Sequence, residues 1–140
     1  MTGGAVVGGF CELILGGARS GKSVLAEARA KASGLDMVYL ATATAGDDEM
    51  SSRIAHHRQR RGADWQLVEE PVALAAALRS HQGEGRCVVV DCLTLWLSNC
   101  LHEDCWQPES AALLDTLPEL SGHVILLATR PALAWFHSVN

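Results

Sequence analysis

A short segment near the N-terminus, Leu15 to Ser23, combines the residue types that bind phosphate groups. Gly16, Gly21, Lys22 and Ser23 follow the spacing Gly-x-x-x-x-Gly-Lys-Ser, after an apolar run and before a helix-forming one. Glycines allow backbone N–H groups to turn toward a phosphate, and the N-terminus of the following helix adds partial positive charge. In that setting we expect Lys22 to reach the terminal phosphates and Ser23 to bind Mg²⁺.

This spacing is that of a P-loop, and the motif needs the strand-to-helix context found here. We therefore predict that the loop binds a nucleotide. The alternative is an ordinary glycine-rich turn with an exposed lysine, which is common in α/β proteins, but the full spacing favours the P-loop. The residues expected to contact nucleotide in this loop are Gly16, Gly17, Ala18, Arg19, Ser20, Gly21, Lys22 and Ser23.

An acid on a neighbouring strand completes such a site by positioning the metal ion. Asp91 ends the run CVVVD, in the most β-like part of the chain. We therefore predict that Ser23 and Asp91 are the metal ligands. An aspartate that caps a strand end or the following helix is also common, so this prediction depends on the P-loop beside it.

A histidine pair lies on a helix predicted from about Asp48 to Arg60. The two side chains are rotated by about 100° from each other, so His57 borders the apolar face and His56 lies on the polar side with arginines. A neutral histidine can attack an α-phosphate, and nearby cations can stabilise the charge that develops. The alternative is a solvated helix face with an incidental histidine, which the spacing alone favours.

The composition limits the class of protein. The 140 residues are 49% hydrophobic and 19% charged, which suits one globular domain and is too short for two. The net charge of −5 argues against a general nucleic-acid-binding protein. No apolar run approaches the roughly 20 residues of a membrane span. The N-terminal stretch has no signal-peptide pattern either, so we expect a cytoplasmic protein. The five cysteines form an odd set without a Cys-x-x-Cys pair, so we expect free, mostly buried thiols in a reducing compartment.

Apolar strands alternate with helices along the chain. Strands that are apolar throughout and separated by helices indicate a mostly parallel sheet covered on both faces, which is a three-layer α/β domain. Gly34 is predicted to end the first helix, and Pro71 to lie in the first turn of another. The predicted strands are 10–17, 37–44, 65–70, 86–92 and 123–129, and the predicted helices are 22–34, 48–60, 71–81, 93–102 and 110–120.

From about Glu12 to Thr129 the sequence resembles the bifunctional adenosylcobinamide kinase / adenosylcobinamide-phosphate guanylyltransferase family of cobalamin synthesis. The resemblance is carried, in order, by LILGGARSGKS, VYLATAT, DDEMSSRIAHHRQRRGADWQLVEEP and VVVDCLTLWLSN. P-loops are shared by many families, so the specific part is the segment around the histidine pair. That part is Arg53-Ile54-Ala55-His56-His57-Arg58, followed by Trp65 and Glu69-Glu70-Pro71.

The resemblance implies a RecA-like P-loop NTPase fold, a homotrimer, Mg²⁺, and GTP and ATP as substrates. It assigns a covalent guanylyl group to His56, with Lys22 as the second catalytic residue. Adenosylcobinamide would first be phosphorylated and then converted into adenosylcobinamide-GDP, with release of pyrophosphate. By position, the resemblance also implies nucleotide contacts at Thr42, Ala43, Thr44, His57, Arg58, Gln59, Arg60, Glu69 and Asp91.

The resemblance ends with the last predicted strand. There the family continues with an Asn-Glu-Val-Gly segment and a further helix and strand, whereas this sequence reads RPALAWFHSVN. We therefore expect one domain over 1–140, with an N-terminal extension at 1–11, an atypical tail at 130–140, and without the family's last helix and strand. An unpaired sheet edge and exposed apolar tail residues would make such a chain poorly stable.

Two other functions remain open at this point. One is a truncated nucleotide-binding remnant of the family that lacks activity. The other is an unrelated small P-loop kinase or ATPase, in which His56 is only a surface residue.

Overall fold

The structure, a computed structural model of the chain, describes residues 9–17, 21–43 and 65–129. The helix predicted over 48–60 lies outside these residues. All five predicted strands are present, and the second runs from Asp36 to Ala41 instead of over 37–44. The strands are β1 (Phe10–Gly16), β2 (Asp36–Ala41), β3 (Trp65–Glu69), β4 (Arg86–Asp91) and β5 (His123–Thr129). The helices are α1 (Lys22–Ser33), α3 (Leu74–His81), α4 (Leu93–His102) and α5 (Trp106–Thr116), followed by the short 3-10 helix η2 (Leu117–Glu119).

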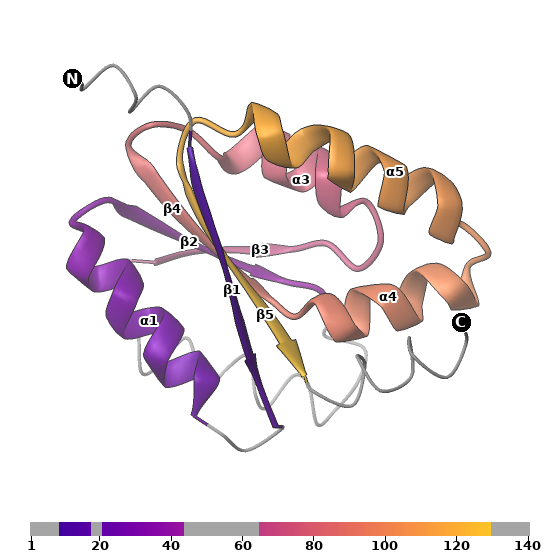
Figure 1. The fold of residues 1–140 in the computed structure, drawn as a ribbon, viewed down its shortest axis with the longest axis horizontal. Helices are drawn as coiled ribbons and strands as arrows, with labels where there is room; N and C mark the ends of the chain where they lie inside the picture. Colours follow the sequence, from indigo (N-terminus) through magenta and orange to yellow (C-terminus); the bar gives the residue numbers. More distant parts are fainter. Residues whose placement is uncertain (1–8, 18–20, 44–64, 130–140) are drawn as a thin grey trace.

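The five strands form one sheet in the order β1-β5-β4-β2-β3, and every pair is parallel. Helix α1 covers one face of the sheet, and α3, α4 and α5 cover the other (Figure 1). The prediction of a three-layer α/β fold with a parallel sheet is therefore confirmed. Within the described part of the chain, no helix is long and apolar enough to span a membrane.

The central strand β4 buries both of its faces. Its side chains alternate between the two sides of the sheet. Cys87 and Val89 face α1 and share a core cluster with Ala26 and Ala30. On the opposite face, Val88 and Val90 pack in a second cluster with residues of α3 and α4, among them Leu74, Leu78 and Trp96. A strand that is buried on both faces reads as a continuous apolar run, which is why RCVVVD was recognisable in the sequence.

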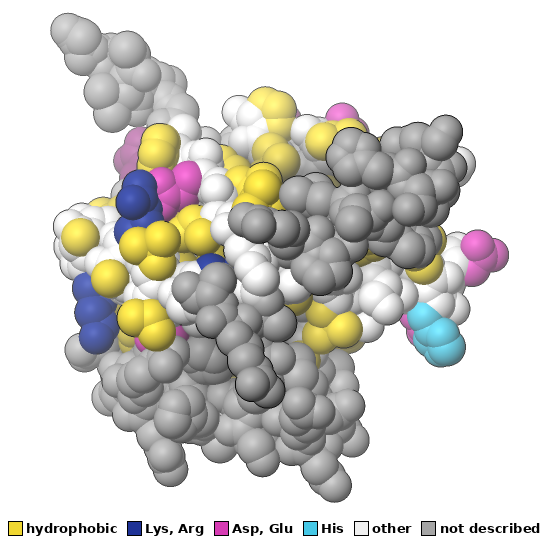
Figure 2. All heavy atoms as spheres, turned by 60° about the horizontal axis from the view of Figure 1, so that its bottom comes forward, with side chains coloured by type: hydrophobic (Ala, Val, Ile, Leu, Met, Phe, Trp, Pro, Cys, Tyr) yellow, Lys and Arg dark blue, Asp and Glu magenta, His cyan; other side chains and the backbone are white. Residues whose placement is uncertain are grey.

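Strand β1 differs from its prediction as a buried strand. Phe10, Leu13 and Leu15 are 56%, 53% and 43% exposed. The physical reason is its position, because β1 lies at the edge of the described sheet and pairs there with β5 alone. Further apolar side chains are exposed on α1, where Val24 and Leu25 are 57% and 48% accessible. On the α1 side of the molecule, apolar and basic side chains lie next to one another (Figure 2).

Helix α3 begins later than predicted, so Pro71 is not in its first turn. The helix starts at Leu74, and the turn before it is closed by the carboxylate of Glu70. Glu70 Oε2 accepts hydrogen bonds from the backbone nitrogens of Val72 at 3.1 Å and Ala73 at 3.0 Å. An upstream carboxylate thus satisfies N–H groups that the start of a helix leaves without partners.

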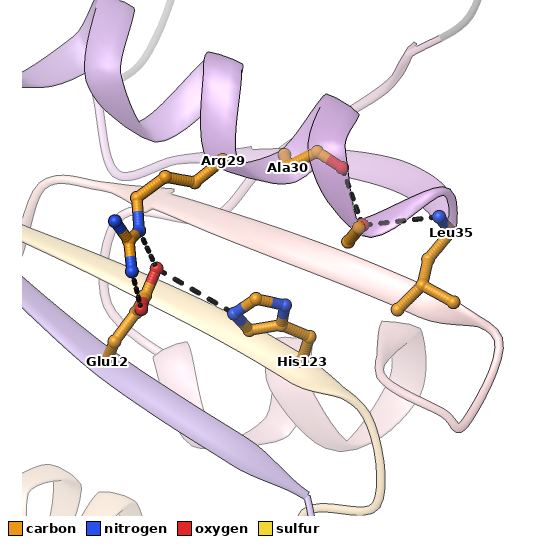
Figure 3. Close-up of polar contacts among 6 residues, drawn as sticks. Glu12, Arg29, Ala30, Leu35 and His123 are labelled. Atoms are coloured by element: carbon orange, nitrogen blue, oxygen red, sulfur yellow. Dashed lines mark hydrogen bonds and ion pairs between the residues drawn. The ribbon is translucent and has the colours of Figure 1, made fainter.

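Helix α1 is attached to β1 by a bidentate ion pair. Arg29 Nε and Nη2 donate to Glu12 Oε1 and Oε2 at 2.6 and 2.9 Å, and His123 Nε2 lies 3.8 Å from the same Oε1 (Figure 3). The Arg29 guanidinium holds the pKa of Glu12 below its ordinary value of 4.5, with a smaller contribution from His123. The helix then ends as predicted at Gly34, whose φ of 73° is left-handed.

This ion pair predicts a pH-dependent stability. The lowered pKa means that folded Glu12 binds its proton less well than in the unfolded chain. The pair therefore stabilises the protein above about pH 4.5, and this stabilisation is lost as the pH falls through the lowered pKa. We expect Glu12→Gln to lower Tm at pH 7, and the difference from the parent to shrink below pH 4.5, as measured by thermal unfolding followed by circular dichroism.

A matched control is Glu119→Gln. Glu119 pairs with Arg79 at 2.7 Å, but both side chains are more than half exposed. Exposed pairs contribute little, so this variant should change Tm less than Glu12→Gln. Equal effects of the two variants at pH 7 would contradict a specific role for the Glu12–Arg29 pair.

Candidate nucleotide-binding site

All five strands run in the same direction, so their carboxyl ends meet at one edge of the sheet. The register aligns a row of residues near that edge. Asp91 pairs with Leu127 of β5 and with Ala41 of β2, and Ala41 pairs with Glu69 of β3. In open α/β sheets ligands bind outside the carboxyl ends of the strands. This edge is therefore the expected position of a site.

Asp91 and Glu69 share one face of the sheet. Residues that pair directly in a parallel sheet point to the same side, and Ala41 belongs to the cluster that packs against α1. Because Asp91 and Glu69 are both register partners of Ala41, their side chains lie on the α1 face. Helix α1 begins at this end of the sheet, directly after the loop that follows β1 (Figure 1). The two acids and the start of α1 are thus on one side of one edge.

The loop after β1 places Lys22 at the start of α1. Gly21 is the N-cap residue, with a φ of 81° that a residue with a side chain rarely adopts. Among the described residues no side chain caps α1, and its first turn contains no acid, so its positive end favours a bound anion. Lys22 Nζ donates to the carbonyl of Gly17 at 3.2 Å, so the lysine points back toward the end of β1.

Asp91 is oriented by a tyrosine from the neighbouring strand. The hydroxyl of Tyr39, on β2, donates to Asp91 Oδ2. Cys92 directly follows Asp91. Burial raises the pKa of the Cys92 thiol, the Asp91 carboxylate raises it further, and the ammonium of Lys22 lowers it. Both charges therefore act on the same residue, where β4 turns into α4.

Thr42 joins the ends of β2 and β4. Its backbone nitrogen donates to the carbonyl of Asp91 at 3.0 Å. Its hydroxyl donates to the carbonyl of Cys92 at 2.9 Å and accepts from the Cys92 nitrogen at 3.0 Å. The Thr42 side chain is fully buried, so the hydroxyl is engaged inside the protein.

Asn99, on α4, holds two further segments of this edge. Its Nδ2 donates to the carbonyl of Thr42 at 3.0 Å, after β2, and to that of Pro71 at 2.9 Å, after β3. Thr94, also on α4, accepts from the backbone nitrogen of Thr129 at the end of β5 at 2.8 Å. Helix α4 thus positions the ends of three strands. Sequence reasoning did not identify Tyr39, Thr94 or Asn99. For Asn99 the local signal is that asparagine is a poor helix former and yet lies within a helix.

The described residues contain part of the predicted site. The structure brings the start of α1, with Lys22 and Ser23, to the same edge and face as Asp91 and Glu69. Ser23 and Asp91 offer oxygen atoms, the donors that Mg²⁺ prefers, but no group of three or more His, Cys, Asp or Glu side chains that could hold a metal occurs in the described ranges. The predicted residues that are described are Gly16, Gly17, Gly21, Lys22, Ser23, Thr42, Ala43, Glu69 and Asp91, whereas Ala18, Arg19, Ser20, Thr44, His56, His57, Arg58, Gln59 and Arg60 lie outside.

The parallel sheet, the glycine-rich sequence after β1 and the lysine at the start of α1 are features of the P-loop class of proteins. The cobinamide kinase / cobinamide phosphate guanyltransferase family matches residues 12–130 of the sequence. The chain belongs to that family, which confirms the resemblance noted in the sequence.

Named relatives support this assignment. The chain is 58% identical over 125 residues to the bifunctional adenosylcobalamin biosynthesis protein CobP of Pseudomonas aeruginosa, an alignment that covers 87% of this chain and 72% of that protein. It is 40% identical over 91 residues to CobU of Escherichia coli, covering 65% of this chain and 50% of that protein. It is 36% identical over 89 residues to CobU of Salmonella typhimurium, covering 64% and 49%. The chain therefore spans about half of the two CobU proteins.

The two hydrogen bonds of Asn99 predict a large effect of its removal. In Asn99→Ala the carbonyls of Thr42 and Pro71 lose a donor, and we expect the free energy of unfolding to fall by about 2 kcal/mol in urea titrations. Asn99→Asp keeps the shape but cannot donate, so it should destabilise at least as much at pH 7.

The matched control is Ser98→Ala, at an exposed neighbouring position of the same helix. It should change the unfolding free energy by less than about 0.5 kcal/mol. A stable Asn99→Asp variant would show that the two hydrogen bonds do not hold this edge together.

Proposed function

We propose that this protein phosphorylates adenosylcobinamide and then transfers a guanylyl group from GTP to the product. The observation that carries the proposal is the placement of Lys22, at the uncapped start of α1, on the same edge and face as Asp91. Family membership supplies the substrate class. The family name pairs a kinase with a guanyltransferase, and the relatives are called bifunctional adenosylcobalamin biosynthesis proteins.

In the kinase step the loop and Lys22 bind the phosphates of the donor nucleotide. Backbone N–H groups at the start of α1 point toward the phosphates, and the ammonium of Lys22 stabilises negative charge on the group that is transferred. Ser23 and Asp91 would hold Mg²⁺, which when bound neutralises phosphate charge. Tyr39 fixes the orientation of Asp91 for that role. ATP and GTP are both candidate phosphate donors.

In the guanylyltransferase step an imidazole nitrogen of His56 attacks the α-phosphorus of GTP. A phosphorus–nitrogen bond forms, the bond to the β-phosphate oxygen breaks, and pyrophosphate leaves with its charge stabilised by Lys22. A phosphate oxygen of adenosylcobinamide phosphate then attacks the same phosphorus and releases His56. The product is adenosylcobinamide-GDP.

The other nucleotide contacts belong to this proposal as the resemblance assigns them. For Thr42 the buried hydroxyl supports an indirect contribution, since it positions the β2–β4 joint beside the site. Glu69 is exposed on the α1 face, which supports a direct one. A homotrimer in the cytoplasm completes the proposal.

Nucleotide binding tests the loop. Lys22→Ala should weaken the affinity for GTP and ATP at least tenfold, about 1.4 kcal/mol, because it removes the charge that faces the terminal phosphates. The matched control is Lys31→Ala, at an exposed position in the last turn of the same helix. Isothermal titration calorimetry measures both variants, and an unchanged affinity of Lys22→Ala would exclude the loop as the site.

Covalent labelling tests the guanylyl transfer. We expect the parent chain, incubated with Mg²⁺ and GTP labelled in the α-phosphate, to retain an acid-labile label through denaturing electrophoresis. His56→Ala should lose the label, whereas the neighbouring His57→Ala should keep at least part of it. A folded parent chain that binds GTP without labelling would favour a nucleotide-binding remnant, and labelling that survives His56→Ala would disprove the assigned nucleophile.

A further inference from the structure

The cysteines differ more in their surroundings than the sequence predicts. All five thiols are free. Cys87 and Cys100 are buried as expected, but Cys11 is exposed on the edge strand β1, and Cys92 and Cys105 are partly exposed. Cys100 lies in the last turn of α4 and Cys105 is the N-cap residue of α5. Figure 1 shows the junction between these two helices. This cysteine pair lies outside the nucleotide-binding site.

The end of α4 brings these two residues together. Asp104 has a left-handed φ of 55°, and the backbone nitrogen of Cys105 donates to the carbonyl of Cys100 at 2.9 Å. The nitrogen of Asp104 donates to the carbonyl of Leu101 at 3.2 Å. These two bonds are those of a Schellman motif, in which the side chains of the outer residues commonly contact each other. Consistent with that contact, Cys105 packs against the core cluster that contains Cys100.

The backbone geometry satisfies the distance requirement of a disulfide. With the hydrogen bond in place, standard bond lengths keep the two Cα atoms within roughly 6.8 Å of each other. Native disulfides span Cα separations of about 4.4 to 6.8 Å. The motif therefore holds Cys100 and Cys105 in a range from which a bond can form without unfolding α4.

We propose that Cys100 and Cys105 form a redox-active dithiol, which a low-molecular-weight disulfide such as glutathione disulfide oxidises reversibly to an intramolecular disulfide. Cys105 is the point of entry because it is the more exposed of the two. Its thiolate attacks one sulfur of glutathione disulfide and releases one glutathione. The thiolate of Cys100 then attacks Sγ of Cys105 and releases the second glutathione. Two electrons pass to glutathione disulfide, and the two thiol protons end on the released glutathiones.

The environment of Cys100 supports this order. Burial, the neighbouring thiol of Cys105 and the carboxylate of Glu109 raise the pKa of Cys100 to about 12. Cys100 is therefore the less reactive thiol near neutral pH, so Cys105 reacts first, and Cys100 gives up its proton only as it attacks the mixed disulfide.

Oxidation leaves the carbonyl of Val72 with a hydrogen-bond donor. The thiol of Cys100 donates to the carbonyl of Val72 at 3.9 Å, which is a weak contact. The same carbonyl accepts a stronger bond from Trp96 Nε1 at 2.8 Å. When the thiol proton is lost, Val72 keeps the indole donor.

The test is thiol counting on the full chain. The protein is equilibrated with glutathione and glutathione disulfide at graded ratios, then denatured and alkylated with N-ethylmaleimide. As the ratio becomes more oxidising, the alkylated thiols in the major species should fall from five to three. Dithiothreitol should restore them. A glutamate-specific protease cuts after Glu103, between the two cysteines, so the disulfide appears as two linked peptides that tandem mass spectrometry assigns.

Variants separate this pair from the other thiols. Cys11→Ser removes the exposed thiol of the edge strand β1 and should leave the linked peptides unchanged. Cys105→Ala should abolish them. The proposal is overturned if the parent chain keeps both thiols alkylated at every ratio, if Cys105 accumulates as a glutathione adduct beside reduced Cys100, or if the linked peptides contain a different pair. The parent chain alone decides between these results, even where a variant does not fold.

Discussion

The parallel pairing of β4 with β2 on one side and β5 on the other fixes where Asp91 lies. Successive side chains of a strand point to opposite faces, so a shift of β4 by one residue would turn Asp91 away from α1. The run of Val88, Val89 and Val90 offers little contrast between the two faces, because the three residues are of one type and all are fully buried. Polar contacts therefore help to specify the register.

Those polar contacts lie at the carboxyl edge of the sheet. Tyr39 donates to Asp91, and Thr42 exchanges hydrogen bonds with the backbone of Cys92. Both sets are made in the observed register, in which Ala41 is opposite Asp91. The interactions that orient the candidate metal ligand thus also favour this strand alignment. A polar group buried without its partner is costly, so stability and site geometry depend on the same few bonds.

The parts of the fold that the sequence predicts are those with local signals. Local residues determine the structure of three such features. They are the apolar run of β4, the glycines before Lys22 and the left-handed Gly34. The exposure of β1 was missed because position at a sheet edge depends on which strands pair, and an apolar run looks the same in the centre and at the edge. Asn99 was missed because its partner Thr42 lies 57 positions away in the sequence.

Helix α4 contains both Asn99, which holds segments of the candidate site's edge, and Cys100 of the proposed dithiol. Asn99, which holds the segments after β2 and β3, directly precedes Cys100, and the nitrogen of Glu103 donates to the carbonyl of Asn99 at 3.0 Å. A disulfide formed across the Schellman motif would keep the backbone hydrogen bonds that end the helix. The part of α4 that contains Asn99 would then stay helical. Oxidation would then restrain the end of α4 without moving the ends of β2 and β3. For that reason the two features are expected to respond independently, with the dithiol changing the stability of the α4–α5 junction and the site changing with the hydrogen bonds of Asn99.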